Sequence, residues 1–215
     1  GTLHVDSDDG FVPFDNASGG ASLYLLGLTP GMATAGALHL YERIWSCSGM
    51  SGTVTTAQTV TSFPSLTIPD ANGTGLELFA EIYTAIGSTA TTVTVSYTNS
   101  ANTSGRTSTA QAIGGTGLNE IRRMIPLPLQ GNDAGVKSIA SATLAASTGT
   151  AGNWGLVLAR KLGTFVSSVA YGAESMDFAA LGMPKVDPDA ALMFVLAAST
   201  TTSGLIDGTM VLGAK

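Results

Sequence analysis

Few side chains in this sequence could serve as a catalytic acid, base or nucleophile. His4 and His39 are the only histidines, and no Gly-x-Ser-x-Gly segment occurs. A hydrolase of the Ser-His-Asp type needs an imidazole beside its nucleophile, and one large group of such enzymes carries the serine on a turn flanked by glycines. The sequence therefore predicts no catalytic residues, and we expect a protein that is not an enzyme.

Two glutamates, Glu77 and Glu81, are the best candidates for a catalytic carboxylate pair. They lie four residues apart in a segment that alternates polar and apolar residues, so they share one face of a strand. At the rise of a strand they are about 13 Å apart, which is farther than the carboxylates of glycosidases. We interpret them as a solvated or interface-facing pair.

Signals for metal or cofactor binding are equally weak. The acidic segment at residues 6–10 lacks the alternating ligands and the closing glutamate of a calcium loop. Cys47 and two distant histidines cannot supply the four ligands of a structural zinc. The glycine-rich residues 114–117 are followed by no Lys-Ser/Thr pair, so they do not form a P-loop. We expect no metal and no cofactor.

Composition limits the choice of partners. Only 11% of the 215 residues are charged, and the net charge is −6 with nine basic residues. So few cations argue against direct binding of nucleic acid. No apolar run is long enough for a membrane span, so we expect no membrane partner. Low charge and a mean hydropathy of +0.31 predict a surface largely covered by protein partners, the alternative being a neutral surface of small residues.

The single cysteine indicates the compartment of folding. Cys47 follows the apolar Ile44 and Trp45, which predicts a buried free thiol and a reducing environment. The first residues have neither the basic start nor the apolar core of a signal peptide. Because the chain begins with Gly1, removal of a leader remains an open alternative.

The strongest pattern is a strand-like alternation over residues 76–86 and 91–99, followed by residues 105–112. In the first segment Leu76, Leu78, Ala80 and Ile82 fall on one face. We expect these segments to form three consecutive strands of an antiparallel meander.

Further strands are expected before and after this meander. Pro64 marks one edge strand, and the alternate prolines of residues 121–129 mark another. Thr29-Pro30-Gly31 predicts a turn. Residues 136–144 and 153–162 are expected to pair, and 189–198 to be covered on both faces. The predicted segments are 22–28, 35–45, 53–60, 62–68, 121–129, 136–144, 153–162, 164–170, 189–198 and 205–212.

These elements predict an all-β fold, an antiparallel β-sandwich of jelly-roll type with one short helical insertion at residues 173–181 before Gly182. Residues 1–20 are predicted to form an N-terminal arm, and residues 21–215 a single β-sandwich domain. Glu42 falls on the apolar face of its strand. It is either buried with a partner such as Arg43 or Arg106, or solvated at an exposed strand end.

Short polar segments connect the central strands within residues 93–106, 131–139 and 146–158. Examples are Asn99-Ser-Ala-Asn-Thr-Ser-Gly105 and Ala146-Ser-Thr-Gly-Thr-Ala-Gly-Asn-Trp154. In these segments the sequence resembles structural proteins of tailed-bacteriophage particles. The resemblance implies a virion component, assembled in the host cytoplasm, of the capsid decoration or cement type. It further implies contacts with other capsid or virion proteins and a homo-oligomer, with a trimer favoured. A tail or fibre component is an alternative.

Five residues are predicted to contact protein partners. Asn99 and Asn102 belong to a loop rich in small polar residues, and Arg106 follows that loop. Phe11 and Phe14 would anchor the arm on a neighbouring copy or on the capsid lattice.

A carbohydrate-binding, lectin-like module is the competing hypothesis. Trp45, Tyr83 and Trp154 would stack on sugar rings if they were exposed. Both tryptophans lie in apolar strand patterns, so we expect them in the core instead.

Overall fold

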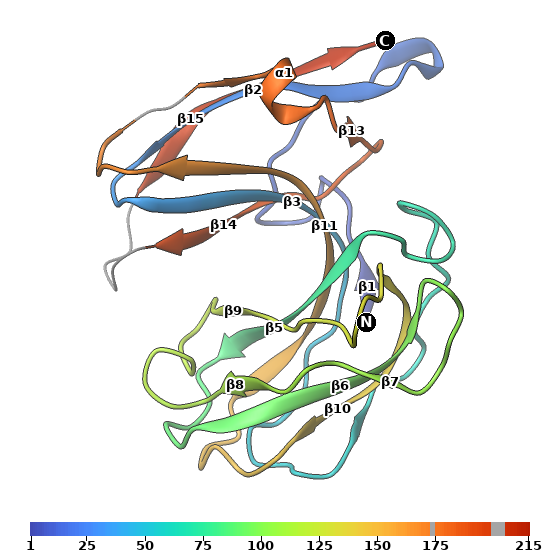
Figure 1. Cartoon of the computed structure of the whole chain (residues 1–215), viewed down its shortest axis with the longest axis vertical. Coiled ribbons are helices and arrows are strands. Elements are labelled where there is room, and N and C mark those ends of the chain that lie inside the picture. The colour runs from blue at the N-terminus through green and yellow to red at the C-terminus, as the bar shows by residue number, and fades with distance from the viewer. Residues whose placement is uncertain (173–174, 199–204) are drawn as a thin grey trace. The chain divides into compact units, whose positions relative to one another are not determined.

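The structure, a computed structural model, describes residues 1–172, 175–198 and 205–215 (Figure 1). In this part of the chain, the helical elements are α1 (Phe178–Leu181) and a single 3-10 turn, η1 (Ser18–Gly20). Fifteen strands make up the regular structure, and they form antiparallel sheets. The prediction of an all-β antiparallel fold with one short helical insertion is confirmed.

The chain folds as two compact units. Unit 1 consists of Gly1–His4 and Arg43–Arg160, and unit 2 of Val5–Glu42 and Lys161–Lys215. Two strands, β3 (Gly36–Ser46) and β11 (Asn153–Ser167), each contribute residues to both units. The sequence analysis treated residues 21–215 as one domain. The division falls inside continuous strands, where no linker composition marks it.

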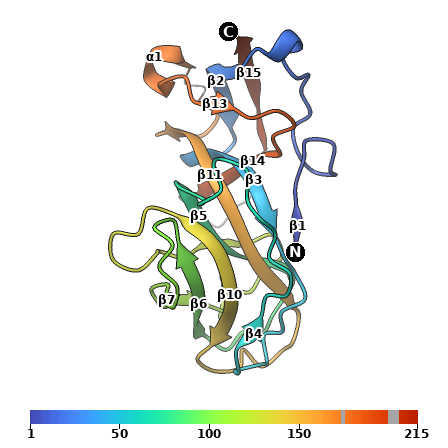
Figure 2. The same ribbon diagram turned by 90° about the vertical axis from the view of Figure 1, so that its right-hand side faces the viewer.

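Unit 1 contains two sheets. Their strand orders are β1-β3-β11-β5-β9 and β4-β10-β6-β7, and β8 also pairs with β6. Figure 2 labels β1, β3, β11 and β5 of the first sheet and β4, β10, β6 and β7 of the second. The remaining strands of this unit are β1 (Thr2–Leu3), β4 (Gln58–Thr59), β5 (Leu76–Thr84), β6 (Thr91–Asn99), β7 (Arg106–Thr107), β8 (Gln111–Ile113), β9 (Met124–Pro126) and β10 (Val136–Leu144).

Alternating apolar side chains of these strands form the core of unit 1. The positions predicted to face inward on β5 are all buried, and so are those on β6. Both tryptophans, Trp45 and Trp154, are fully buried in the same core. The core includes Leu76, Leu78, Ala80, Ile82, Val93, Val95, Tyr97, Ile139, Leu144, Leu156 and Leu158.

Two predicted strand pairings in unit 1 are wrong. β5 pairs with β11 and β9, whereas β6 belongs to the other sheet, so residues 76–86 and 91–99 are not neighbours in a meander. β10 and β11, predicted to pair, are likewise in different sheets. An alternating pattern shows that a strand buries one of its faces. The pattern does not distinguish a next strand that pairs with it in the same sheet from one that packs against it in the opposite sheet. The predicted pairing of β6 with the segment that follows it is confirmed.

The segment between β3 and β5 contains much less strand than its β-branched residues predict. Of residues 53–60 and 62–68, only Gln58 and Thr59 form a strand, which pairs with β10. The Gln58 side chain accepts a hydrogen bond from Ser51 N at 2.7 Å and donates one to Ser51 O at 3.0 Å, so local bonds replace a sheet ladder here. The predicted edge strand at residues 121–129 is confirmed, because β9 ends its sheet.

Unit 2 also forms two layers of strand. β2 (Leu23–Met32) pairs with β12 (Met176–Asp177), β13 (Lys185–Val186) and β15 (Ile206–Ala214). β14 (Leu192–Ala198) pairs with residues 36–42 of β3. Their shared core includes Leu25, Leu28, Met32, Leu38, Leu40, Leu162, Phe165, Val186 and Leu192.

Several predictions for unit 2 are corrected by the structure. Pro30 lies within β2 opposite Gly208 of β15, not in a turn. The strand β12 pairs with β2 no farther than Leu28, so the missing N–H of Pro30 does not interrupt a central ladder. β11 runs through residue 163 to Ser167, where two separate strands were expected. In β14 only Leu192 is buried among residues 192–197, so this strand is not covered on both faces.

The predicted helix is shorter than expected. Asp177 caps its N-terminus, accepting hydrogen bonds from Ala179 N and Ala180 N, and Gly182 ends it in the left-handed conformation. Met176 and Asp177 form β12 instead of helix, and residues 173–174 lie outside the described residues. The predicted C-terminal end is therefore confirmed and the predicted start is not.

The first 20 residues pack against their own chain. Leu3 and Thr2 pair with β3 at Trp45 and Ser46 in unit 1. In unit 2, Val12 N donates to Leu192 O at 3.1 Å, and Asp189 N donates to the side chain of Asn16 at 3.0 Å. The described part of the chain has no helix of the length and apolarity that a membrane span requires.

Candidate functional site

The structure divides the five predicted contact residues between the two units. Asn99, Asn102 and Arg106 belong to unit 1, and Phe11 and Phe14 belong to unit 2. The members of the first group lie on or beside one loop, whereas Phe14 lines a cavity in unit 2. The five residues therefore do not form a single site.

Asp133 organises the loop that carries the first group. Its carboxylate accepts hydrogen bonds from Arg106 Nε at 2.8 Å, from the Tyr97 hydroxyl at 2.7 Å and from the Asn99 amide at 2.7 Å. Arg106 Nη2 donates a further bond at 3.1 Å, which makes the ion pair bidentate. The Arg106 guanidinium, with smaller contributions from Tyr97 and Asn99, lowers the pKa of Asp133 to about 2.

This network changes the interpretation of the predicted contact residues. Asn99 is only 6% exposed, and its side chain also accepts a bond from Thr103 N at 2.8 Å, so it shapes the loop from inside. The prediction that Asn99 is a surface contact is wrong. Arg106 is committed to Asp133, whereas Asn102 is exposed and accepts a hydrogen bond from Lys137 Nζ at 2.7 Å. Sequence analysis missed Asp133 because its Gly-Asn-Asp context predicts only a turn.

The Asp133 network predicts acid sensitivity. The folded pKa of about 2 lies below the usual value of about 3.9, so the unfolded chain binds this proton first as the pH falls. The stabilisation that the ionised Asp133 provides to the folded chain is complete above about pH 4. It should be lost progressively as the pH falls towards 2. Urea unfolding of the intact chain between pH 5 and pH 2, compared with Asp133→Asn, measures this loss.

The Asp133→Asn variant should be less stable at pH 5 and show a flatter dependence of the unfolding free energy on pH. Asp9→Asn, which changes an exposed carboxylate in unit 2, is the matched control and should keep the wild-type slope. Equal slopes for the intact chain and Asp133→Asn would contradict the assignment of the acid-sensitive group.

A second ion pair in unit 1 joins β3 and β5, which lie on either side of β11 in the same sheet. Arg43 Nη2 lies 2.6 Å from Glu81 Oε2 and donates a hydrogen bond to the Tyr83 hydroxyl at 2.8 Å. Both charged side chains are largely buried. Burial, opposed by the Arg43 charge and reinforced by Glu81, raises the pKa of Tyr83 to about 12. The interpretation of Glu81 as a solvated group is wrong, and the pair belongs to the fold.

Glu42 is 1% exposed, so the alternative of a solvated strand end is wrong. Its two proposed partners are engaged elsewhere, Arg43 with Glu81 and Arg106 with Asp133.

The structure creates one serine–histidine contact that sequence analysis did not anticipate. His4 Nε2 lies 2.7 Å from Ser46 Oγ, and Ser46 is buried. A buried hydroxyl cannot reach a substrate carbonyl, so this pair holds the N-terminal residues on β3. His39 Nδ1 lies 2.9 Å from the Thr164 hydroxyl in unit 2. No group of three or more potential metal ligands occurs among the described residues.

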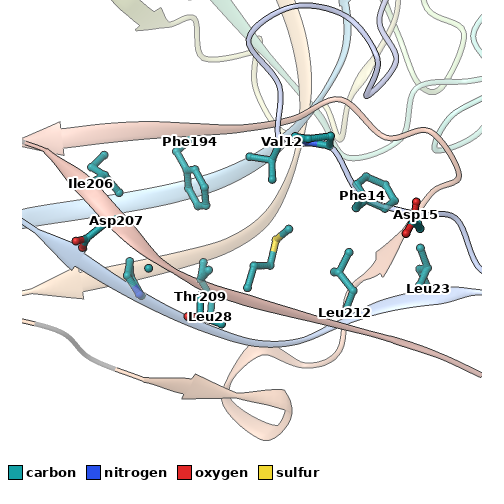
Figure 3. A pocket seen from close by; sticks show the side chains of 14 residues that line it. Val12, Phe14, Asp15, Leu23, Leu28, Phe194, Ile206, Asp207, Thr209 and Leu212 are labelled. Carbon is teal, nitrogen blue, oxygen red and sulfur yellow. The ribbon is translucent and has the colours of Figure 1, made fainter.

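Unit 2 contains a cavity of about 680 Å³ between its two layers. Apolar side chains from β2, β14 and β15 line it, and so do Val12, Pro13 and Phe14. Figure 3 shows Val12 and Phe14 beside Phe194, Leu23 and Leu212. Asp15 and Asp207 lie at opposite ends of the view. The cavity has the size and character of a small-molecule site. Phe14, predicted to reach a neighbour, instead packs against the core of its own unit.

The surface of unit 2 carries most of the exposed large apolar side chains in the described ranges. Tyr171 is 84% exposed and Phe178 is 56% exposed. Ten of the fifteen acidic residues but only three of the nine basic residues belong to this unit, so the net negative charge of the chain resides there. The other exposed large apolar side chains of this unit, which we call its exposed apolar surface, are Val5, Val166, Val169, Met183, Leu205 and Val211.

Comparison of the sequence with protein-family models finds no match, and comparisons with curated proteins and with solved structures find none either.

Proposed function

We propose that the chain is a non-enzymatic structural component of a virus particle, a capsid decoration or cement protein that acts through protein–protein contacts. The resemblance of residues 93–106, 131–139 and 146–158 to tailed-bacteriophage structural proteins suggests the particle. The observation that carries the proposal is the exposed apolar surface of unit 2. Large apolar side chains exposed on a surface are a feature of protein contacts when they gather into a patch.

An open sheet edge in unit 2 supports the same proposal. Among the described strands, β15 pairs only with β2, over residues 206–214. The unpaired side of such a strand can accept another strand or must be shielded from aggregation. A neighbouring copy or a capsid subunit would provide that shielding.

The net charge of unit 2 indicates what kind of partner surface it would contact. Unit 2 has ten acidic and three basic residues, whereas unit 1 has five acidic and six basic residues. Because complementary potentials guide association, the surface that receives unit 2 is expected to be neutral or basic. Unit 1 of a second copy meets this condition better than unit 2 does, which is compatible with a homo-oligomer, with a trimer favoured by the analogy with decoration proteins.

The sugar-binding alternative requires exposed aromatic rings that can stack on a sugar. Trp45 and Trp154 are fully buried, so neither ring can stack on a sugar, and the Tyr83 hydroxyl is bound by Arg43. We therefore do not favour a lectin-like module.

The proposal is tested by the mass of the chain in solution, measured by light scattering after size exclusion. We expect a homo-oligomer for the intact chain. The double variant Tyr171→Asp with Phe178→Asp should shift it to monomer, because two carboxylates would be buried in the contact. Ile121→Asp, an exposed apolar position in unit 1, is the matched control and should leave the mass unchanged.

The particle itself provides the second measurement. Purified particles of the phage whose genome encodes the chain should contain it, and the double variant should bind them at least about tenfold more weakly. A chain that is monomeric and absent from the particles would overturn the proposal.

A further inference from the structure

The cavity of unit 2 is partly open to solvent. It has a volume of about 680 Å³ and lies between β14 on one side and β2 with β15 on the other. The volume falls within the range of about 300–1,000 Å³ that is typical of ligand sites.

The lining of this cavity is mainly apolar, and its polar side chains are Asp15, Asp207 and Thr209. Leu23 and Leu28 are buried, and the side chains of Phe14, Phe194 and Met210 are partly exposed. Each of these three also packs against the core of unit 2, so the apolar part of the cavity borders that core. A ligand that fills it must present an apolar body.

The charged groups at the cavity have one sign. Asp15 and Asp207 line it, both are exposed, and Figure 3 places them at opposite ends. Among the described residues, no lysine, arginine or histidine lines the cavity. Two carboxylates without a cation disfavour an anionic ligand at either end and favour a positive group there.

We propose that this cavity binds an elongated apolar molecule that is neutral or carries a positive charge at one end. Its apolar body fills the space between β14 and β15, and its polar end lies beside Asp15 or Asp207. Fatty acids and other anionic amphiphiles are disfavoured by the two carboxylates. This site is independent of the exposed apolar surface, since Tyr171 and Phe178 do not line it.

Residues 12–15 form one side of the cavity. Val12 N donates to Leu192 O at 3.1 Å, and Asn16 beyond this side bonds to Asp189. These bonds hold the segment in place at its two ends. A ligand reaches the apolar lining from the side of the cavity that is open to solvent.

Three probes with the same ten-carbon chain test the proposal: decyltrimethylammonium, 1-decanol and decyl sulfate, each below the concentration at which it aggregates. Isothermal titration of the full chain should detect one site for the first two. Decyl sulfate should bind at least about tenfold more weakly than decyltrimethylammonium. Absence of binding by all three probes, or equal binding by all three, would overturn the proposal.

Two tryptophan substitutions on neighbouring residues locate the site. Met210→Trp places a larger side chain inside the cavity and should weaken decanol binding at least about tenfold. Val211→Trp adds the same ring to a residue that does not line the cavity and should change binding less than about twofold. Equal effects of the two variants would mean that the probe binds elsewhere on the surface, which contradicts the proposal.

Charge variants keep the test valid if Met210→Trp does not fold. Asp15→Asn with Asp207→Asn changes two exposed residues and should raise the affinity for decyl sulfate while lowering that for decyltrimethylammonium. Asp9→Asn, an exposed carboxylate that does not line the cavity, should change neither affinity. If no probe binds and Met210→Trp instead alters the oligomeric mass, the cavity receives a second copy of the chain and the small-molecule proposal is wrong.

Discussion

Replacing Trp154 with alanine should lower the free energy of unfolding of unit 1 by about 3 to 5 kcal/mol. Its ring is fully buried, and the residue lies where β11 pairs with β5 opposite Ile82. Its backbone also exchanges two hydrogen bonds with Met50, at 2.9 and 3.0 Å. Removing the ring therefore leaves a cavity where two structural elements meet, and the main chain on both sides limits how far the core can collapse.

Trp154→Phe is the matched control for this experiment. It keeps most of the buried ring and removes the indole N–H, which has no hydrogen-bond partner among the described residues. We expect a loss of about 1 kcal/mol, because the smaller cavity is partly offset by removal of an unsatisfied donor. Chemical unfolding followed by circular dichroism measures both variants. A small effect of alanine would mean that the ring is not in the core.

The same residues decide the sugar-binding alternative. Trp45 and Trp154 are the only tryptophans, and both are fully buried. Their fluorescence should therefore stay unchanged when glycans are added. A spectral shift with an intact fold would restore the lectin-like hypothesis.

Replacing Arg43 with methionine should cost about 3 kcal/mol of unfolding free energy. The substitution keeps an extended side chain but leaves the Glu81 carboxylate, 14% exposed, without its cation at 2.6 Å. It also removes the donor to the Tyr83 hydroxyl. Leaving the buried carboxylate without its cation lowers the free energy of unfolding far more than removing both charged side chains does.

The double variant Arg43→Met with Glu81→Met should therefore recover part of this loss. A second ion pair, Arg123 with Glu120 at 3.0 Å, provides the control, because both of its side chains are well exposed. Arg123→Met should cost less than about 1 kcal/mol. If Arg43→Met and Arg123→Met have equal effects, or the double variant loses as much as both single variants together, the buried pair does not act as described.

The sequence pattern correctly predicts which side chains of β5 and β6 face the core of unit 1. The alternation of β5 and β6 places Leu78, Ala80, Val93 and Val95 inward because successive strand residues point to opposite faces, whatever their neighbours are. The prolines of residues 121–129 determined an edge strand because they cannot donate to a central ladder. The left-handed Gly182 determined the end of α1. All three are local effects.

How those strands pair, and which polar groups come into contact, depends on tertiary packing. The buried faces of β5 and β6 are compatible with two strands that pair in one sheet and equally with two strands that face each other from opposite sheets. Which arrangement forms depends on β11, whose residues pair with β5 from about 70 residues farther along the chain. Asp133 meets Arg106 and Tyr97 only after β6 has paired with β10. The cavity of unit 2 depends on the separation of strands that are each apolar in sequence. Spacing along a chain contains no information on such distances, because they arise from the simultaneous packing of segments far apart in sequence.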